Sequence, residues 1–131
     1  MEHFILPCLY PDASPEKGRG IFTKEPLTEG SIVENSPVVV MDAAARKLLD
    51  QTLLHDYIFE WQPEGQALCC MAMGYLPLYN HAYNSNCEYE MDYPSHSMSI
   101  KAMRDIEAGE ELTINYNGDW DDAKPVWFDT V

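Results

Sequence analysis

The chain has 131 residues, 46% of them hydrophobic and 11% aromatic, which predicts one folded domain with its own core rather than a disordered segment. Its 22 acidic and 8 basic residues give a net charge of −14, which argues against nucleic acid as a partner and favours a basic protein or peptide. No apolar run approaches the ~20 residues of a membrane-spanning helix. We also see no export signal at the N-terminus, so we expect an intracellular protein without a membrane partner.

The first half of the chain is typical of short strands followed by a helix. Apolar segments separated by Gly- and Pro-rich stretches predict strands at 3–10, 20–27 and 31–42, a loop at 11–20 and a turn at 28–30. Pro37 predicts a break or an edge position in the third strand, because proline cannot donate to a ladder. Helix formers are dense in 43–57, and one face of this predicted helix carries Ala44, Leu48, Gln51 and His55.

The second half of the chain predicts strands alone. Two short strands at 57–61 and 67–73 flank the turn at 62–66, and segments 87–93 and 97–103 flank the turn at 94–96 as a hairpin. A last strand follows the glycine turn at 109. Many short strands and one helical stretch indicate a mainly β domain with a small helical insert.

The four cysteines, Cys8, Cys69, Cys70 and Cys87, contain no C-x-x-C pair. This spacing makes both a zinc site and a disulfide framework weak interpretations, so we expect no metal and predict free thiols, some of them buried. A metal protein built on Cys and His is kept as a third alternative, and bound zinc in the purified protein would identify it.

Three short motifs stand out in chain order: Gly18-Arg19-Gly20, then "NHAYNSN" at 80–86, then "GEELTINY" at 109–116. Each has an ordinary structural explanation when taken alone. Two glycines around one residue are typical of a turn, Asn and Ser favour turns, and a tyrosine in a strand usually packs in a core. The order and separation of the three motifs carry more information than any one of them.

Together these motifs resemble the SET-domain protein-lysine methyltransferases, over residues 18 to 117. The family carries a G-x-G near its start, an N-H-x-x-x-x-N in the middle and a G-E-E-[LI]-x-x-x-Y near its end. The resemblance implies a SET (β-clip) fold of short strands and small sheets, in one domain spanning 1–131 with a core of about 3–118. It also implies a C-terminal pseudoknot, in which residues 109–116 pass beneath the loop at 80–86.

The resemblance further implies a cofactor, S-adenosylmethionine. The backbone of Gly18, Arg19 and Gly20 would hold its methionine part. Asn80 and His81 would bind it too, His81 chiefly through its backbone, while the His81 side chain braces the loop. Asn86 would support the same loop.

By the same resemblance, Tyr116 would be the catalytic tyrosine. Tyr57 would lie near the transferred methyl group, where it would both bind the cofactor and take part in catalysis. No cysteine-rich segment follows Tyr116 in the sequence. We therefore expect residues 119–131 to complete the lysine channel, which Tyr116 and three aromatic side chains would line: Trp120, Trp127 and Phe128.

The implied activity is methylation of a lysine in a basic protein or histone-like tail. The alternative is a non-catalytic acidic β module that binds basic peptides. A pure binding module need not retain the set that methyl transfer requires, namely Gly18, Gly20, Asn80, His81 and Tyr116. The apolar tail could also bury itself in a homodimer.

Overall fold

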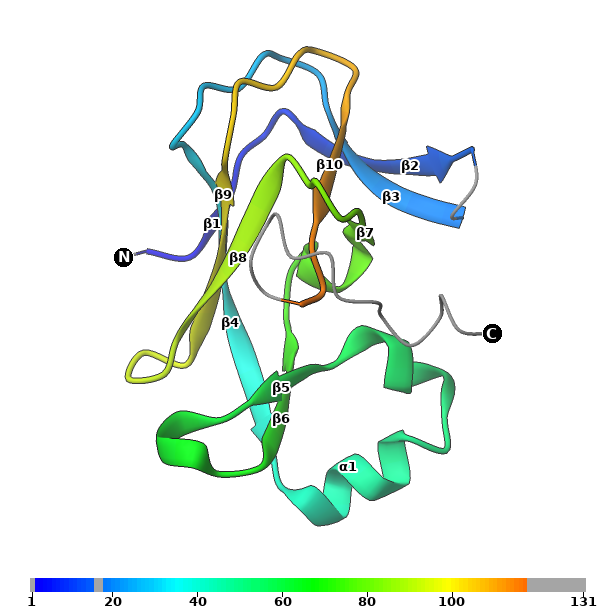
Figure 1. The fold of residues 1–131 in the computed structure, drawn as a ribbon, viewed down its shortest axis with the longest axis vertical. Helices are drawn as coiled ribbons and strands as arrows, with labels where there is room; N and C mark the ends of the chain where they lie inside the picture. The colour runs from blue at the N-terminus through cyan, green and yellow to red at the C-terminus, as the bar shows by residue number, and fades with distance from the viewer. Residues whose placement is uncertain (1, 16–17, 118–131) are drawn as a thin grey trace.

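The computed structural model describes residues 2–15 and 18–117 of the chain. Their fold is mainly β, with one short α-helix and three 3₁₀ turns in the described part (Figure 1). In chain order the elements are β1 (Phe4–Ile5), β2 (Leu9–Ser14), β3 (Gly18–Thr23), β4 (Ile32–Met41), α1 (Ala43–Leu49), η1 (Leu53–Tyr57), β5 (Phe59–Trp61), η2 (Pro63–Gly65), β6 (Leu68–Ala72), η3 (Leu76–Leu78), β7 (Asn80–His81), β8 (Cys87–Asp92), β9 (Ser97–Ala102) and β10 (Glu111–Ile114).

A larger, antiparallel sheet has the strand order β5-β6-β4-β9-β8, with β1 also paired to β4. Its long central strand, β4, changes partner along its length. Pro37 pairs with Ser97 at the end of the β9 ladder, and Val38 opens the ladder to β6. Pro37 therefore does not break the strand. Its missing N–H lies where one ladder ends and the next begins, which is where a strand tolerates proline.

A smaller sheet, with the order β2-β3-β10-β7, brings the sequence motifs together. β10 pairs antiparallel with β3 and parallel with β7. In the parallel pair, Thr113 lies opposite Asn80 and Ile114 opposite His81, although about thirty residues of chain separate the two strands. The expected convergence of 80–86 with 109–116 is confirmed. The threaded pseudoknot crossing stays a prediction.

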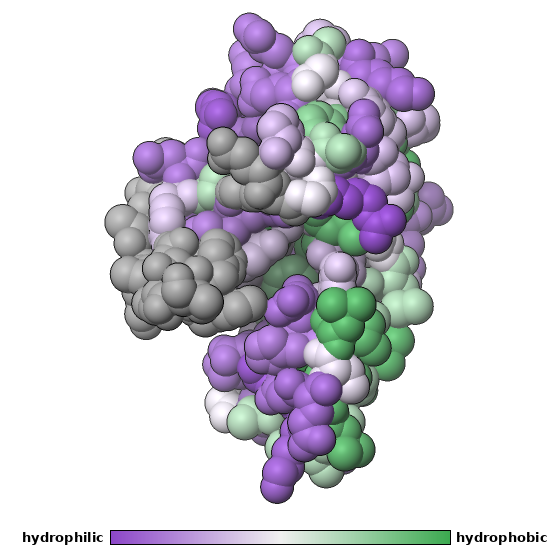
Figure 2. Space-filling model, turned by 90° about the vertical axis from the view of Figure 1, so that its right-hand side faces the viewer, coloured by the Kyte–Doolittle hydropathy of each residue, from purple (hydrophilic) through white to green (hydrophobic). Residues whose placement is uncertain are grey.

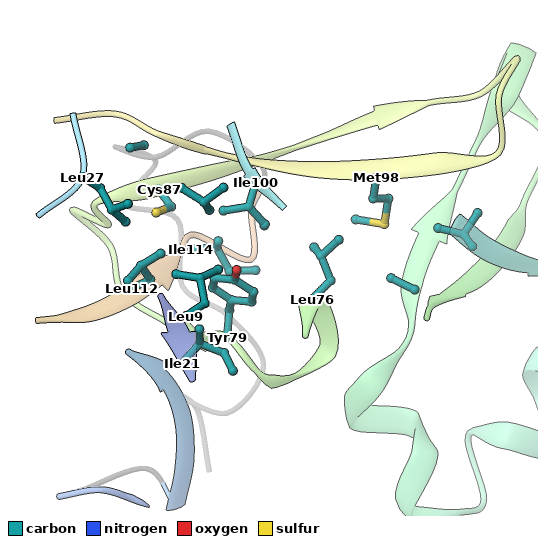
Figure 3. Close-up of a cluster of buried hydrophobic side chains, with 14 of the residues drawn as sticks. Leu9, Ile21, Leu27, Leu76, Tyr79, Cys87, Met98, Ile100, Leu112 and Ile114 are labelled. Carbon is teal, nitrogen blue, oxygen red and sulfur yellow. The ribbon is translucent and has the colours of Figure 1, made fainter. Parts of the chain in front are cut away.

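The core lies between these two sheets (Figure 3). Alternate residues of β9 and β10 point inward, as the twofold period of a strand requires, and they are fully buried. Figure 3 shows Leu112 and Ile114 near Leu9 and Ile21 around the ring of Tyr79, with Leu76 between this group and Met98. The labelled members of this cluster are Leu9, Ile21, Leu27, Leu76, Tyr79, Cys87, Met98, Ile100, Leu112 and Ile114.

The strands predicted around both turns of the second half are confirmed as the pairs β5–β6 and β8–β9, and the last predicted strand is confirmed as β10. Three of the four cysteines, Cys69, Cys70 and Cys87, are buried as predicted. Burial raises the pKa of the Cys70 and Cys87 thiols to about 12. Among the described residues, no helix has the length and apolar character needed to cross a bilayer.

The predicted strand at 3–10 is wrong. The backbone turns between two short strands, where the Leu9 N–H donates to the Leu6 carbonyl at 3.1 Å. β2 then continues through residues 11–14, predicted to be loop, because each pairs with β3 from Ile21 back to Gly18. The predicted strand at 20–27 is also displaced. β3 begins at Gly18 and ends at Thr23.

The predicted helix at 43–57 is divided in two. Asp42 caps α1, which ends at Leu49. Thr52 then donates its hydroxyl to the Leu49 carbonyl and accepts from the Leu54 N–H, which starts η1. This local capping competes with continuation of the helix. Packing does not stabilise a longer helix against it, because α1 buries no side chain.

The insert formed by α1 and η1 carries exposed apolar residues. The face predicted for this helix, with Ala44, Leu48, Gln51 and His55, is not buried against the core. Leu48 is 69% exposed and Leu53 75% exposed. Figure 2 shows hydrophobic surface gathered on the lower part of the molecule, beside a hollow that separates this part from the upper one.

Candidate active site

The side chain of Asn80 joins the three motifs at one point. Its Nδ2 donates to the Arg19 carbonyl at 3.3 Å and to the Glu111 carboxylate at 2.7 Å. The other oxygen of Glu111 accepts from the Ser14 hydroxyl at 3.0 Å. A carboxylate can only accept hydrogen bonds, so Glu111 fixes which way the Asn80 amide points. The carbonyl oxygen of Asn80 is then the atom of this amide that can accept a further donor.

Glycine is favoured at each of the two positions of the first motif for a different structural reason. A Cβ on Gly20 would lie 2.2 Å from the Glu111 carboxylate and 2.8 Å from Asn80 Nδ2. Any side chain at Gly20 would therefore push apart the contact that joins the motifs. Gly18 has a φ of 76°, which disfavours other residues, and apart from Gly18 and its chain neighbours no atom of residues 2–15 and 18–117 lies within 4 Å of where its Cβ would be.

Asn86 fastens the loop at 80–86 to β10. Its Oδ1 accepts from the Thr113 N–H at 2.8 Å, and its Nδ2 donates to the Glu111 carbonyl at 2.8 Å and to Glu110 at 2.9 Å. Because Asn86 is buried, these bonds satisfy backbone groups that strand pairing does not reach. The expected supporting role agrees with this geometry.

His81 links the same loop to the residues that follow β10. Its Nδ1 accepts from the Tyr116 N–H at 3.0 Å, which leaves the proton of a neutral imidazole on Nε2. The ring packs edge-on against Tyr83, with centroids 4.5 Å apart, and is tilted against Tyr116 at 5.1 Å. Asn115 adds a bond from its Nδ2 to the Tyr83 carbonyl at 3.1 Å. The side chain of His81 therefore braces Tyr116 and its neighbours.

Tyr116 lies at the edge of the interior, with 36% of the residue exposed. Its hydroxyl donates to the Tyr79 carbonyl at 2.8 Å, and its own carbonyl accepts from the Tyr89 hydroxyl at 3.3 Å. Burial of the phenol, with smaller effects from nearby Asp56 and Tyr57, raises the pKa of Tyr116 to about 12. This phenol is neutral at physiological pH, so it can hold a partner by hydrogen bonds but is not an anionic base.

Tyr57 is the last residue of η1. It is half-buried, and its phenol is one of the lesser influences that raise the pKa of Tyr116. The structure brings Asn80 against Arg19 and Gly20, and His81 against Tyr116. Gly18 begins the strand that carries Arg19 and Gly20, and Tyr57 is placed only at the end of η1. The other expected channel residues, Trp120, Trp127 and Phe128, lie outside the described residues.

The sequence did not reveal Glu34, a fully buried carboxyl on β4. Its Oε2 accepts from the Ser36 hydroxyl and the Tyr75 and Leu76 N–H groups, at 2.7, 2.8 and 3.2 Å. Its Oε1 accepts from the Tyr79 hydroxyl at 3.1 Å. Desolvation raises the pKa of Glu34, and these four hydrogen bonds oppose the rise. The one sign of this buried carboxyl in the sequence is the position of an acidic residue within the otherwise largely apolar strand β4.

Side chains that could hold a metal do not gather in the part of the chain that the structure describes. No group of three or more His, Cys, Asp and Glu residues within 2–15 and 18–117 could hold a metal ion.

Comparison with known proteins agrees with this site. The SET domain family model matches residues 18–117. A histone-lysine N-methyltransferase of Schizosaccharomyces pombe, specific for H3 lysine-37, is 32% identical over 101 residues, which cover 76% of this chain and 67% of that protein. A crystal structure of a candidate histone methyltransferase of Plasmodium falciparum matches with a TM-score of 0.64 and 25% identity, over 86% of this chain and 99% of that one.

The fold and these relatives define a protein-lysine methyltransferase. The chain belongs to the SET domain family. The family and the fold class predicted from the three motifs are therefore confirmed.

The bonds from Asn86 to β10 predict that Asn86 and Asn84, in the same loop, contribute very differently to stability. Asn86→Ala leaves buried backbone groups of β10 without partners, so we expect the free energy of unfolding to fall by about 2–4 kcal/mol. Asn84 is exposed in the same loop, so Asn84→Ala should change it by less than about 0.5 kcal/mol. Urea denaturation measures the free energy of unfolding of both variants. Equal losses would contradict the proposed role of Asn86 in fastening the loop to β10.

Proposed function

We propose that this chain transfers a methyl group from S-adenosylmethionine to a lysine side chain of a basic protein, with Tyr116 as the catalytic tyrosine. The observation that carries the proposal is the position of the Tyr116 hydroxyl. It is held on the Tyr79 carbonyl, directly before the Asn80-His81 strand that contacts the Gly-Arg-Gly backbone. The backbone at 79–81 would therefore hold the catalytic Tyr116 hydroxyl at Tyr79 and bind the cofactor at Asn80 and His81.

The donors and acceptors around Asn80 fit the amino-acid part of this cofactor. Glu111 and the Arg19 carbonyl engage the amide hydrogens of Asn80, so its carbonyl oxygen is available to accept from an ammonium group. We propose that Gly18, Arg19 and Gly20 hold the methionine part through their backbone, and that Asn80, His81 and Tyr57 complete the site.

When bound, S-adenosylmethionine supplies an electrophilic methyl group on a sulfonium sulfur, which a neutral amine can displace. Lysine has a pKa of about 10.4, so its neutral form costs about 4.6 kcal/mol at pH 7. We propose that Tyr116 and Tyr57 line an aromatic passage for the lysine, which would lower this cost because desolvation disfavours the ammonium form. Holding the amine in line for attack can contribute roughly 7–11 kcal/mol. Orientation is therefore the main contribution of this protein.

Tyr116 provides this orientation. Its hydroxyl donates to the Tyr79 carbonyl, which fixes the position of the phenol, and we propose that the phenol oxygen accepts from an amine N–H of the substrate. Because its pKa is about 12, Tyr116 does not remove the lysine proton at neutral pH. We propose that Trp120, Trp127 and Phe128 of the C-terminal segment complete the channel around the lysine.

A basic substrate suits the charge of the chain. The net charge of −14 attracts Lys- and Arg-rich segments over a distance of about 10 Å at ordinary ionic strength. The named activity of the Schizosaccharomyces pombe relative, on a histone lysine, supports the same class of substrate. We propose a histone-like tail as the substrate class.

Tyr116→Phe tests the catalytic role. Without the hydroxyl, turnover of a basic protein substrate should fall by about 10²-fold or more, while the affinity for S-adenosylhomocysteine stays nearly unchanged. Mass spectrometry of the methylated lysine measures the turnover, and calorimetry measures the affinity.

The matched control is Tyr93→Phe, which removes a hydroxyl from a ring packed on Trp61 in another part of the fold. It should keep its activity. Undiminished turnover in Tyr116→Phe would remove Tyr116 from the mechanism.

Glu111→Gln tests the cofactor site through binding alone. A glutamine can face Asn80 with either its oxygen or its amide nitrogen, so the orientation of Asn80 is no longer fixed. A charge-assisted bond is also lost, and we expect binding of S-adenosylhomocysteine to weaken about tenfold. Methylthioadenosine lacks the amino-acid part, so its affinity should not change.

The control is Glu107→Gln, which removes the same charge from the exposed turn before β10. It should leave both affinities unchanged. Equal weakening of both ligands by Glu111→Gln would show that Glu111 has no specific relation to the amino-acid part.

A further inference from the structure

The buried carboxyl of Glu34 lies outside the cofactor site but is connected to Tyr116 through one residue, Tyr79. The Tyr79 hydroxyl donates to Glu34 at 3.1 Å, and the Tyr79 carbonyl accepts from the Tyr116 hydroxyl at 2.8 Å. Tyr79 is itself buried. Its ring lies within the apolar core, among side chains of both sheets (Figure 3). One residue is therefore held at its phenol by Glu34 and bound at its backbone by Tyr116.

Glu34 also holds the segment that leads to Tyr79. The Tyr75 and Leu76 N–H groups both donate to its Oε2, at the start of η3. Gly74 passes so close that a Cβ there would lie 2.3 Å from this oxygen. Residues 74–79 are thus wrapped around a single carboxyl group.

The carboxyl is a fixed point for this segment. The backbone of Glu34 pairs with Ile5 on one side and with Ile100 on the other, inside the larger sheet. Burying a carboxyl costs free energy that an apolar residue of similar size would avoid. That cost is offset only while the donors stay in place, so Glu34 and residues 74–79 hold each other in one arrangement.

We propose that Glu34 is a positioning residue for methyl transfer. It fixes the Tyr79 carbonyl through the Tyr79 phenol and the backbone of residues 74–76, and the carbonyl in turn fixes the Tyr116 hydroxyl. This proposal rests on the proposed function insofar as Tyr116 orients the substrate amine. Displacement of a positioned group by a fraction of an ångström is enough to lower turnover strongly, without any contact between Glu34 and the substrate.

Tyr79→Phe removes the link with the smallest change, since the ring stays in the core and only the hydroxyl is lost. We expect kcat to fall about tenfold, with the KM for the cofactor and the affinity for S-adenosylhomocysteine within about twofold of wild type. Glu34→Gln keeps an oxygen for the two backbone donors, but its amide group meets the Tyr79 hydroxyl. It should lower kcat to a similar extent.

The control is Thr23→Val, which also removes a buried hydroxyl, one that donates to the Glu25 carbonyl outside this network. It should lower stability comparably but keep kcat within about twofold of wild type. If Tyr79→Phe and Thr23→Val change kcat equally, Glu34 serves stability alone and the proposal is wrong.

A second readout does not depend on activity. In protein labelled with ¹³C at the tyrosine ring carbon that bears the hydroxyl, the Tyr116 signal is identified by its absence in Tyr116→Phe. We expect it to shift in Tyr79→Phe and in Glu34→Gln, and to stay in place in Thr23→Val. If Glu34→Gln does not fold, Tyr79→Phe carries the test.

These two readouts separate the two proposals. A wild-type protein that methylates no basic substrate contradicts the proposed function, and the ring signal then decides whether Glu34 positions Tyr116. An unshifted Tyr116 signal in Tyr79→Phe overturns the positioning role whatever the activity.

Discussion

β7 and β10 run parallel, with Asn80 opposite Thr113 and His81 opposite Ile114. Each strand is too short to be stable alone, and side chains at the ends of the pair add to its ladder and to the burial of Leu112 and Ile114. Asn86 bonds the backbone of β10 on one side, and His81 bonds the Tyr116 N–H on the other. Because the site is built from segments that are distant in sequence, it exists only in the folded domain. The position of Tyr116 and the orientation of Asn80 both follow from this pairing.

The sequence predicted the strands whose apolar residues alternate, such as β8, β9 and β10, because alternation directly reports one buried face. It did not predict residues 11–14 as strand, since an edge strand that carries Pro, Asp and Ser is held by its ladder to β3 rather than by burial. The helix at 43–57 was too long for a similar reason. Helix propensity describes the local chain, whereas the end at Leu49 depends on the Thr52 cap and on the lack of a packed face.

The candidate site was predictable where function leaves a local pattern, as in the Asn-His pair and in the strand before Tyr116. Glu34, Tyr79 and Glu111 were missed because their partners are distant in sequence. The Tyr79 hydroxyl meets a carboxyl 45 residues away, and Asn80 meets one 31 residues away. A polar residue in an apolar strand signals that some partner exists, but its identity comes only from the three-dimensional arrangement. These buried polar contacts give the core its specific geometry around Tyr116.

Backbone amide NMR during titration with S-adenosylhomocysteine tests most directly whether this convergence forms a cofactor site. The account predicts that the largest shifts fall on three separate stretches of the sequence, at 18–20, 80–82 and 112–117, and saturate together with one affinity. No shifts at high ligand concentration, or shifts confined to a remote element such as the β8–β9 hairpin, would contradict it.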